Sequence, residues 1–253
     1  MKKLCIIVPC YNEEASLPDS ILQLSTLLTG MTGSGIIDAS SFLLFVDDGS
    51  KDHTWETITD AAAVSPHIDG LRLPCNQGPQ QALMAGLKAA VAQADITVTV
   101  DADLQDDIRM IPEMIRRYDA GCDVVCGVRR NRRCDTPFKR LTAGVFYRLM
   151  LLAGAPLIAD HADFRLMSRR AVSLMTEKYR DGCLFLRGAV MQLGLPVATV
   201  SYDRLPRTAG TTKFPLRKML LFAIDGIMQE GLLGSFLKRK YISMRLRPVN
   251  DKK

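Results

Sequence analysis

The sequence is poor in the residues that build zinc sites and disulfide frameworks. It contains 3 histidines, and its 7 cysteines are an odd number without a Cys-x-x-Cys pair. Structural zinc sites need clustered Cys and His ligands, and disulfide scaffolds of secreted proteins need paired cysteines. These absences argue against both classes and favour a protein of a reduced, cytoplasmic setting.

Long apolar runs are also missing. No stretch reaches the roughly 18 uninterrupted apolar residues of a membrane-spanning helix. The opening MKKLCIIVPCYNEE has a short apolar run that ends in Asn-Glu-Glu, which indicates a first strand rather than a signal peptide. With 253 residues, 47% of them hydrophobic, the chain can bury the core of one large domain or of a domain with an appendage.

Basic residues gather at the C-terminal end of the chain. Residues 204–253 hold 12 Lys and Arg against 3 Asp and Glu, whereas residues 1–203 hold 21 against 24. The interleaved aromatic and basic residues of a base-stacking surface are missing, so we expect no nucleic-acid partner. An anionic membrane surface explains the charge at least as well. Residues 213–237 suit an interfacial helix, although a core-packed helix with snorkelling lysines fits nearly as well.

Short β-rich runs alternate with helical patterns over the first half of the chain. The runs lie at 4–8, 42–46, 71–73, 96–100 and 123–127, and the helix-like segments lie near 15–28, 53–64, 79–92 and 108–119. Such alternation predicts an α/β fold, with a mostly parallel sheet and helices on both faces. From residue 128 the alternation stops, and we expect a further helical stretch near 183–193 and a β-rich run at 197–202.

Polar residues follow four of the predicted strands. They are PCYNEE at 9–14, DDGSKD at 47–52, NQG at 76–78 and an aspartate cluster at 101–107. In mostly parallel sheets, ligands bind beyond the carboxyl ends of the strands. We therefore expect the four loops to meet at one edge of the sheet and to form a site.

Two of the clustered aspartates suit a metal ion. Asp101 and Asp103 stand two residues apart at a predicted strand end, so their side chains can point to the same side. Two hard oxygen ligands with room for water and phosphate oxygens suit Mg²⁺ or Mn²⁺, which would bridge them to a nucleoside diphosphate. The alternative for such a cluster is a helix cap or a solvated turn, which we expect for Asp106 and Asp107 before a helix that starts at Ile108.

The Asp47-Asp48-Gly49-Ser50 stretch leaves two interpretations open. In the first, Gly49 makes a turn and Asp52 caps the next helix. In the second, Asp47 or Asp48 binds the base or the ribose hydroxyls of a nucleotide. The local sequence favours neither.

Together these motifs resemble glycosyltransferase family 2, which comprises inverting enzymes with the Rossmann-like GT-A fold. The motifs are V-P-x-Y-N-E at 8–13, D-D-G-S-x-D-x-T at 47–54, N-x-G at 76–78 and D-A-D-L-Q at 101–105. An Arg-rich segment at 129–140, A-D-F-R-L-M at 162–167 and R-x-x-G-x-T-K-F at 207–214 resemble the polyprenyl-phosphate branch of that family. The resemblance covers roughly residues 4–225.

The resemblance implies a catalytic domain over residues 1–212 and a basic, amphipathic, membrane-proximal tail over residues 213–253. Members of the branch usually carry a pair of spanning helices after the segment that corresponds to KFPLRKMLLFAIDGI. In this chain the residues that follow are too polar and too short to span as a pair. This ending fits a naturally peripheral enzyme, a truncated product or an engineered form, and the sequence does not choose among them. The location that we expect is peripheral, on the cytoplasmic face of the membrane.

The resemblance also implies roles for individual residues. Catalytic roles fall to Asp163 and Asp103, and the metal ligands would be Asp101, Asp103 and Gln105. The nucleotide sugar would contact Pro9, Tyr11, Glu13, Asp48, Asp101, Gln105, Arg207 and Lys213. The acceptor phosphate would contact Arg129, Arg133 and Arg165. The alternatives are a solvated basic face for the Arg-rich segment and a buried structural interaction between Asp163 and Arg165.

The predicted reaction is transfer of a hexose-type sugar from a UDP- or GDP-sugar to a polyprenyl phosphate. A hydroxyl acceptor would need a general base. A lipid phosphate, with a second pKa of about 6, is largely ionised already, so Asp163 would orient a substrate more than abstract a proton. A saccharide hydroxyl acceptor and a non-catalytic sugar-nucleotide-binding, membrane-associated protein are the alternatives. A homo-oligomer is compatible with the sequence.

Overall fold

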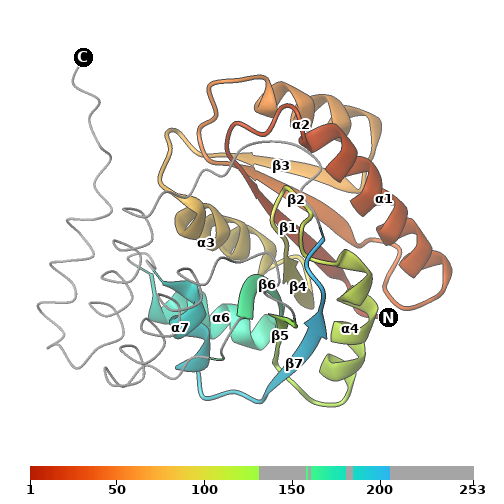
Figure 1. Cartoon of the computed structure of the whole chain (residues 1–253), viewed down its shortest axis with the longest axis vertical. Coiled ribbons are helices and arrows are strands. Elements are labelled where there is room, and N and C mark those ends of the chain that lie inside the picture. Colours follow the sequence, from red (N-terminus) through yellow and green to blue (C-terminus); the bar gives the residue numbers. More distant parts are fainter. Residues whose placement is uncertain (131–157, 159–160, 181–184, 206–253) are drawn as a thin grey trace, which may run out of the picture.

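A computed structural model of the chain describes residues 1–130, 158, 161–180 and 185–205 (Figure 1). Its elements are, in chain order, β1 (Leu4–Cys10), α1 (Leu17–Gly33), β2 (Phe42–Asp47), α2 (Thr54–Val64), β3 (Ile68–Arg72), α3 (Pro79–Ala90), β4 (Ile96–Thr99), the short 3₁₀ helix η1 (Ile108–Met110), α4 (Ile111–Asp119), β5 (Val124–Arg129), β6 (His161–Ser168), α6 (Arg169–Lys178), α7 (Leu186–Met191) and β7 (Val197–Tyr202).

Most of the predicted elements are present. The strands at 4–8, 42–46, 96–100, 123–127 and 197–202 and the four helices of the first half are confirmed, and the predicted third strand begins three residues earlier, at Ile68. The helix expected near 183–193 is the shorter α7. Strand β6 and helix α6 were not predicted. The predicted boundary between residues 212 and 213, and the tail beyond it, lie outside the described residues.

Seven strands form one sheet in the order β3-β2-β1-β4-β6-β5-β7. The pairs β1–β2, β1–β4, β2–β3 and β5–β7 are parallel, which confirms the predicted mostly parallel sheet. Strand β6 is antiparallel to both of its neighbours, β4 and β5. As a result, the beginning of β6 lies at the same edge of the sheet as the carboxyl ends of β4 and β5.

Helices cover both faces of the sheet, because the strands are apolar on both sides. Helices α1, α2 and α4 pack on one face, and α3, α6 and α7 pack on the other (Figure 1). Each face has its own buried cluster, the first around Phe45 and Phe164 and the second around Ile7 and Met167. None of the described helices is long and apolar enough to cross a membrane.

Two helical glycines offer a matched test of this packing. A Cβ atom on Gly86 of α3 would lie 2.5 Å from Ile7 Cγ2 and 3.0 Å from Val46 Cγ2, whereas a Cβ on Gly30 of α1 would meet nothing within 4 Å. We expect Gly86→Ala to lower the free energy of unfolding by about 1–3 kcal/mol through overpacking. Gly30→Ala should raise it by up to about 1 kcal/mol, because alanine favours the helix. Urea denaturation checks both changes, and equal effects would contradict the close approach of α3 to β1.

Candidate active site

The loops after β1, β2 and β3 interlock at one edge of the sheet. The Asn12 backbone N–H donates to Ser50 Oγ at 2.9 Å, and the Lys51 N–H donates to Asn12 Oδ1 at 2.9 Å. Asp48 joins the third loop, because its carboxylate accepts from the backbone N–H groups of Gln77 at 2.7 Å and Gly78 at 2.9 Å. These contacts confirm the predicted convergence for three of the four polar loops.

The turn after β2 follows the structural interpretation of its sequence. Gly49 has φ +67°, and a Cβ there would lie 2.6 Å from the Cys75 carbonyl carbon, so the position needs glycine. The Asp52 carboxylate accepts from the Thr54 N–H at 3.1 Å at the start of α2, but the N-cap residue is His53, one position after the predicted Asp52. Asp48 is buried, and burial raises the pKa of its carboxyl, although the two backbone hydrogen bonds act to lower it; the nearby Asp47 charge adds to the rise. Its contact with a nucleotide stays a prediction.

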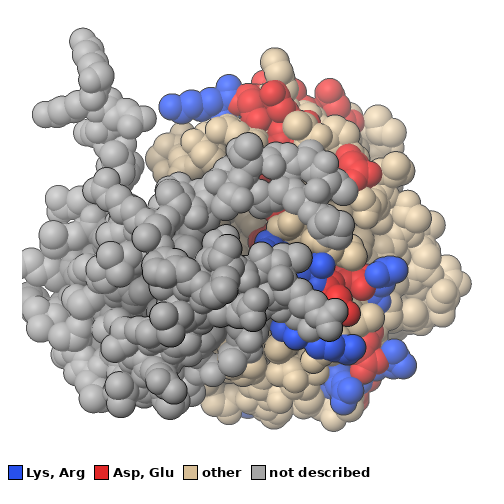
Figure 2. All heavy atoms as spheres, in the orientation of Figure 1, with Lys and Arg blue, Asp and Glu red and all other residues tan. Residues whose placement is uncertain are grey.

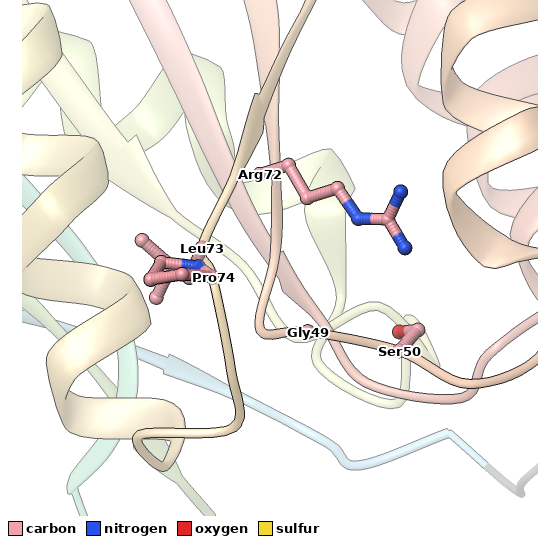
Figure 3. Close-up of a pocket in the computed structure, with 5 residues that line it drawn as sticks. All are labelled: Gly49, Ser50, Arg72, Leu73 and Pro74. Carbon is pink, nitrogen blue, oxygen red and sulfur yellow. The ribbon is translucent and has the colours of Figure 1, made fainter. Parts of the chain in front are cut away.

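A pocket of about 320 Å³ lies beside this turn, lined by Gly49, Ser50, Arg72, Leu73 and Pro74 (Figure 3). Arg72 extends across it, with Nε 3.2 Å from Asp47 Oδ2 and its guanidinium 5.6 Å from the centre of the Trp55 ring. The ion pair and the aromatic contact fix the Arg72 side chain. The pocket therefore lies directly beside the turn that follows Asp48.

The predicted metal ligands lie in the loop after β4. Asp103 Oδ1 accepts from the Gln105 N–H at 3.3 Å, and the intervening Leu104 is buried with φ +45°, a conformation that costs a non-glycine residue energy. Burial, reinforced by the charges of Asp106, Asp163 and Asp103, raises the pKa of Asp101 to about 7. A cluster of carboxylates that repel one another fits a divalent cation, which would relieve the repulsion.

Among the described residues, no three His, Cys, Asp or Glu side chains are grouped as a complete metal cage. Magnesium is commonly held by one or two carboxylates together with water and substrate phosphates. The pair Asp101 and Asp103 therefore fits a cation that is completed by a bound diphosphate.

Asp163 stands next to this loop because of the antiparallel course of β6. Thr99 of β4 is paired with Arg165, and the Thr99 hydroxyl donates to the Asp163 carbonyl. The Asp163 carboxylate accepts from Arg187 at 3.3 and 3.1 Å and from Arg165 at 3.4 Å, and the Gln80 amide lies at 3.5 Å. Burial acts to raise the pKa of Asp163, but Arg187 and Arg165 outweigh it and hold that pKa well below its usual range.

Arg165 lies beneath Asp163 rather than at the surface. Its side chain is 1% exposed and also donates to the Leu186 carbonyl at 3.4 Å. This burial favours the structural alternative for Arg165 over contact with an acceptor phosphate. The neighbouring His161 is buried as well, and its Nδ1 lies 2.9 Å from the Ile158 carbonyl oxygen. Burial, together with Arg165 and Arg187, lowers the pKa of His161 to about 4, so its ring is neutral at pH 7.

A second buried polar cluster lies at the C-terminal end of the loop that follows β4. Asp106 is 1% exposed, and its Oδ1 accepts from Arg129 Nε at 3.1 Å, from Arg129 Nη2 at 2.9 Å and from the Tyr202 hydroxyl at 2.6 Å. Asp106 was predicted to be a helix cap or a solvated residue, and that prediction is wrong. The prediction is confirmed for Asp107, whose carboxylate accepts from the Arg109 N–H at the start of η1.

The other predicted site residues are placed as follows. Pro9 is in β1, and Tyr11 and Glu13 follow it in the interlocked loops. Gln105 accepts from Arg204 through its side chain and from the Leu205 N–H through its carbonyl at 2.9 Å. Arg133, Arg207 and Lys213 lie outside the described residues. On the face in Figure 2, the coloured basic and acidic side chains lie largely side by side rather than in one large basic patch.

Sequence reasoning missed Gln80, Arg187, Tyr202 and Arg204. Period-2 alternation at 161–166, with His161, Asp163 and Arg165 on one face of the strand, could have indicated β6. Gln80 follows a Gly-Pro pair that starts a helix, which is a weaker signal. No local pattern indicates that Arg187 reaches Asp163.

Solved structures share the fold of this chain. Over 94% of this chain and 80% of the other, the structure resembles glucosyl-3-phosphoglycerate synthase from Mycobacterium tuberculosis in complex with Mn²⁺, UDP and glucosyl-3-phosphoglycerate, with a TM-score of 0.55 and 18% identity. The Mg²⁺ and UDP complex of the same enzyme matches with a TM-score of 0.55 and 18% identity, over 94% of this chain and 79% of the other. The fold is that of the GT-A glycosyltransferases.

Within this class, the chain belongs to glycosyl transferase family 2, whose model matches residues 5–174. It is 48% identical to the glycosyltransferase YkoT of Bacillus subtilis over 224 residues. This alignment covers 88% of this chain and 66% of YkoT. It is 37% identical over 233 residues to the prophage bactoprenol glucosyl transferase homolog of Escherichia coli, over 89% of this chain and 71% of that protein. The chain thus spans just under two thirds of the length of YkoT. The chain thus carries a family 2 glycosyltransferase domain, and its resemblance to polyprenyl-phosphate sugar transferases is confirmed.

Proposed function

We propose that this glycosyltransferase moves a hexose-type sugar, with inversion, from a nucleoside-diphosphate sugar to a polyprenyl phosphate. The bactoprenol glucosyl transferase homologs of Escherichia coli and Shigella phages support this acceptor class. Structural neighbours bound to UDP with Mn²⁺ or Mg²⁺ support the donor class and a divalent metal. The basic charge of residues 204–253 supports contact with the anionic face of a membrane.

The state of Asp163 carries this proposal. Arg187 and Arg165 keep its carboxylate ionised and its pKa well below the usual range, although burial opposes them. A general base works best when its pKa is near the operating pH, so this carboxylate is a weak proton acceptor at pH 7. A hydroxyl acceptor would need such a base. A phosphate acceptor, ionised before it binds, would not.

The roles of the other residues follow from their places. Asp48 and the pocket beside it would bind the nucleoside, and Asp101 and Asp103 would hold the divalent ion against the diphosphate, with Gln105 next to them. The bound cation would act as a Lewis acid that stabilises the departing diphosphate. Asp163 would orient the sugar and the acceptor oxygen for attack on the anomeric carbon from the side opposite the leaving group. The acceptor-phosphate roles of Arg129 and Arg133 and the nucleotide-sugar contacts of Arg207 and Lys213 stay proposals.

A pair of matched lipids tests the acceptor. Radiolabelled UDP- and GDP-sugars are offered with polyprenyl phosphate or with the corresponding polyprenol, which has a hydroxyl in place of the phosphate. We expect label in the organic phase with polyprenyl phosphate and at least about 100-fold less with polyprenol, since Asp163 is a weak base. Equal transfer to both lipids, or transfer only to a soluble saccharide, would contradict the proposal.

A further inference from the structure

Two side chains reach Asp163 from different helices, and neither was predicted from the sequence. Arg187 lies in the first turn of α7 and Gln80 lies at the start of α3. Neither residue is close to Asp163 in the sequence, which is 24 residues from Arg187 and 83 from Gln80. Their meeting at one carboxylate is therefore a product of the fold.

Arg187 donates hydrogen bonds to both oxygens of the Asp163 carboxylate. Its Nε is 3.3 Å from Asp163 Oδ1, and its Nη2 is 3.1 Å from Oδ2. A planar guanidinium in this fork geometry restricts rotation of the carboxylate as well as balancing its charge. The Arg187 side chain is 29% exposed, whereas Arg165 on the other side of Asp163 is 1% exposed. Of the two arginines that pair with Asp163, Arg187 is therefore the one that reaches solvent.

Gln80 connects the two helices beneath this pair. Its Oε1 accepts from the Leu186 N–H at 2.8 Å, and its Nε2 lies 3.5 Å from Asp163 Oδ2. The Leu186 carbonyl accepts from Arg165 at 3.4 Å. Leu186, which precedes Arg187, is therefore hydrogen-bonded through both its N–H and its carbonyl. These bonds fix the position from which Arg187 reaches Asp163.

We infer that Arg187 and Gln80 are positioning residues, which set the orientation of the Asp163 carboxylate at the reacting centre. This inference rests on the proposed function in one respect, the place of Asp163 beside the sugar and the acceptor. Displacement of a reacting group by about 1 Å can cost about 100-fold in rate, so residues of this kind affect turnover more than substrate binding.

The test uses the full chain and compares Arg187→Gln, Arg187→Lys, Arg187→Ala and Gln80→Leu. Turnover is followed as release of the nucleoside diphosphate, which reports transfer to any acceptor, water included. Calorimetric titration with the donor counts competent sites, so that each kcat refers to folded enzyme. Arg170→Gln is the matched control, because Arg170 on α6 is 70% exposed and pairs with Asp123, away from Asp163.

We expect Arg187→Gln to lower kcat about 100-fold with little change in donor Kd. Arg187→Lys, which keeps the charge without the fork, should recover about tenfold of that loss. Gln80→Leu should lower kcat about tenfold, the effect of one lost hydrogen bond. Added methylguanidinium should restore part of the activity of Arg187→Ala in a saturable manner, and Arg170→Gln should match the wild type.

Three results would overturn the inference. They are wild-type kcat in Arg187→Gln, a loss confined to donor affinity, or equal losses in the Gln and Lys variants without rescue by methylguanidinium. The last result would indicate a purely structural ion pair. Failure of the proposed function looks different, because the wild-type enzyme itself would then release nucleoside diphosphate without labelling polyprenyl phosphate.

Discussion

Replacement of Asp103 by asparagine should nearly abolish turnover while the protein stays folded. Asp103 lies in the loop after β4, two residues from Asp101, and both carboxylates fit a divalent cation that bridges to the diphosphate. Loss of one charged ligand weakens binding of the metal ion. It also removes part of the positive charge that would stabilise the diphosphate as it departs. We expect kcat/KM to fall by about 1000-fold or more, which corresponds to roughly 4 kcal/mol.

Calorimetry separates the metal effect from a folding defect. In the wild type, Mg²⁺ or Mn²⁺ should strengthen binding of the nucleoside diphosphate, and in Asp103→Asn that dependence should disappear. Asp119→Asn is the control, because Asp119 ends α4 and pairs with Lys2 on the surface. Retention of metal-dependent nucleotide binding by Asp103→Asn would rule out the assigned ligand.

The second large effect concerns stability and the cluster of Asp106, Arg129 and Tyr202. Arg129 was predicted to bind the acceptor phosphate, yet two of its nitrogens donate to the buried Asp106. Removal of one partner from a buried ion pair leaves an uncompensated charge, which costs about 3–5 kcal/mol. Arg129 is 25% exposed, so we expect Arg129→Met to fall at the lower end, about 3 kcal/mol, and to lower Tm by roughly 6–12 °C.

An adjacent pair of the same chemistry provides the control. Arg109 pairs with Asp107 at 2.7 Å, but its side chain is 73% exposed, so Arg109→Met should change stability by less than about 1 kcal/mol. In the double variant Asp106→Asn with Arg129→Met, part of the lost stability should return, because the unpaired charge is gone. Thermal and urea denaturation measure all three. An unchanged Tm in Arg129→Met, together with a raised KM for the lipid phosphate, would instead favour the acceptor role alone.

The parallel part of the fold could be predicted from sequence because its signals are local. Continuous apolar runs such as those at 4–8 and 42–46 alternate with helical periodicity, and each run ends in polar residues. Asp101, Asp103 and Asp48 were found in this way, since the carboxyl ends of parallel strands share one edge of the sheet. The structure adds that Asp48 reaches the third loop through the backbone of Gln77 and Gly78.

The rest could not be predicted because it depends on partners far away in the sequence. Asp106 and Asp107 are neighbours with the same chemistry, yet Asp107 pairs with the nearby, exposed Arg109, whereas Asp106 is bound by Arg129, 23 residues away, and by Tyr202, 96 residues away. The role of Asp163 was taken from a family resemblance. Its contacts with Arg187 and Gln80 could be found only in the three-dimensional structure. Strand β6 was missed because it has no continuous apolar run: His161, Asp163, Arg165 and Ser168 are polar.

The place of β6 between β4 and β5 has a consequence for the order in which the protein is made. Strands β4 and β5 leave the ribosome before β6, but neither can pair with its final neighbour on that side until residues 161–168 have followed. Until then both apolar strands present open edges, which are prone to association with other chains. A nascent chain that stops before residue 161 already contains Asp101 and Asp103 but lacks Asp163. The active site is therefore completed late in translation, by a single long-range strand insertion of the kind that slows folding.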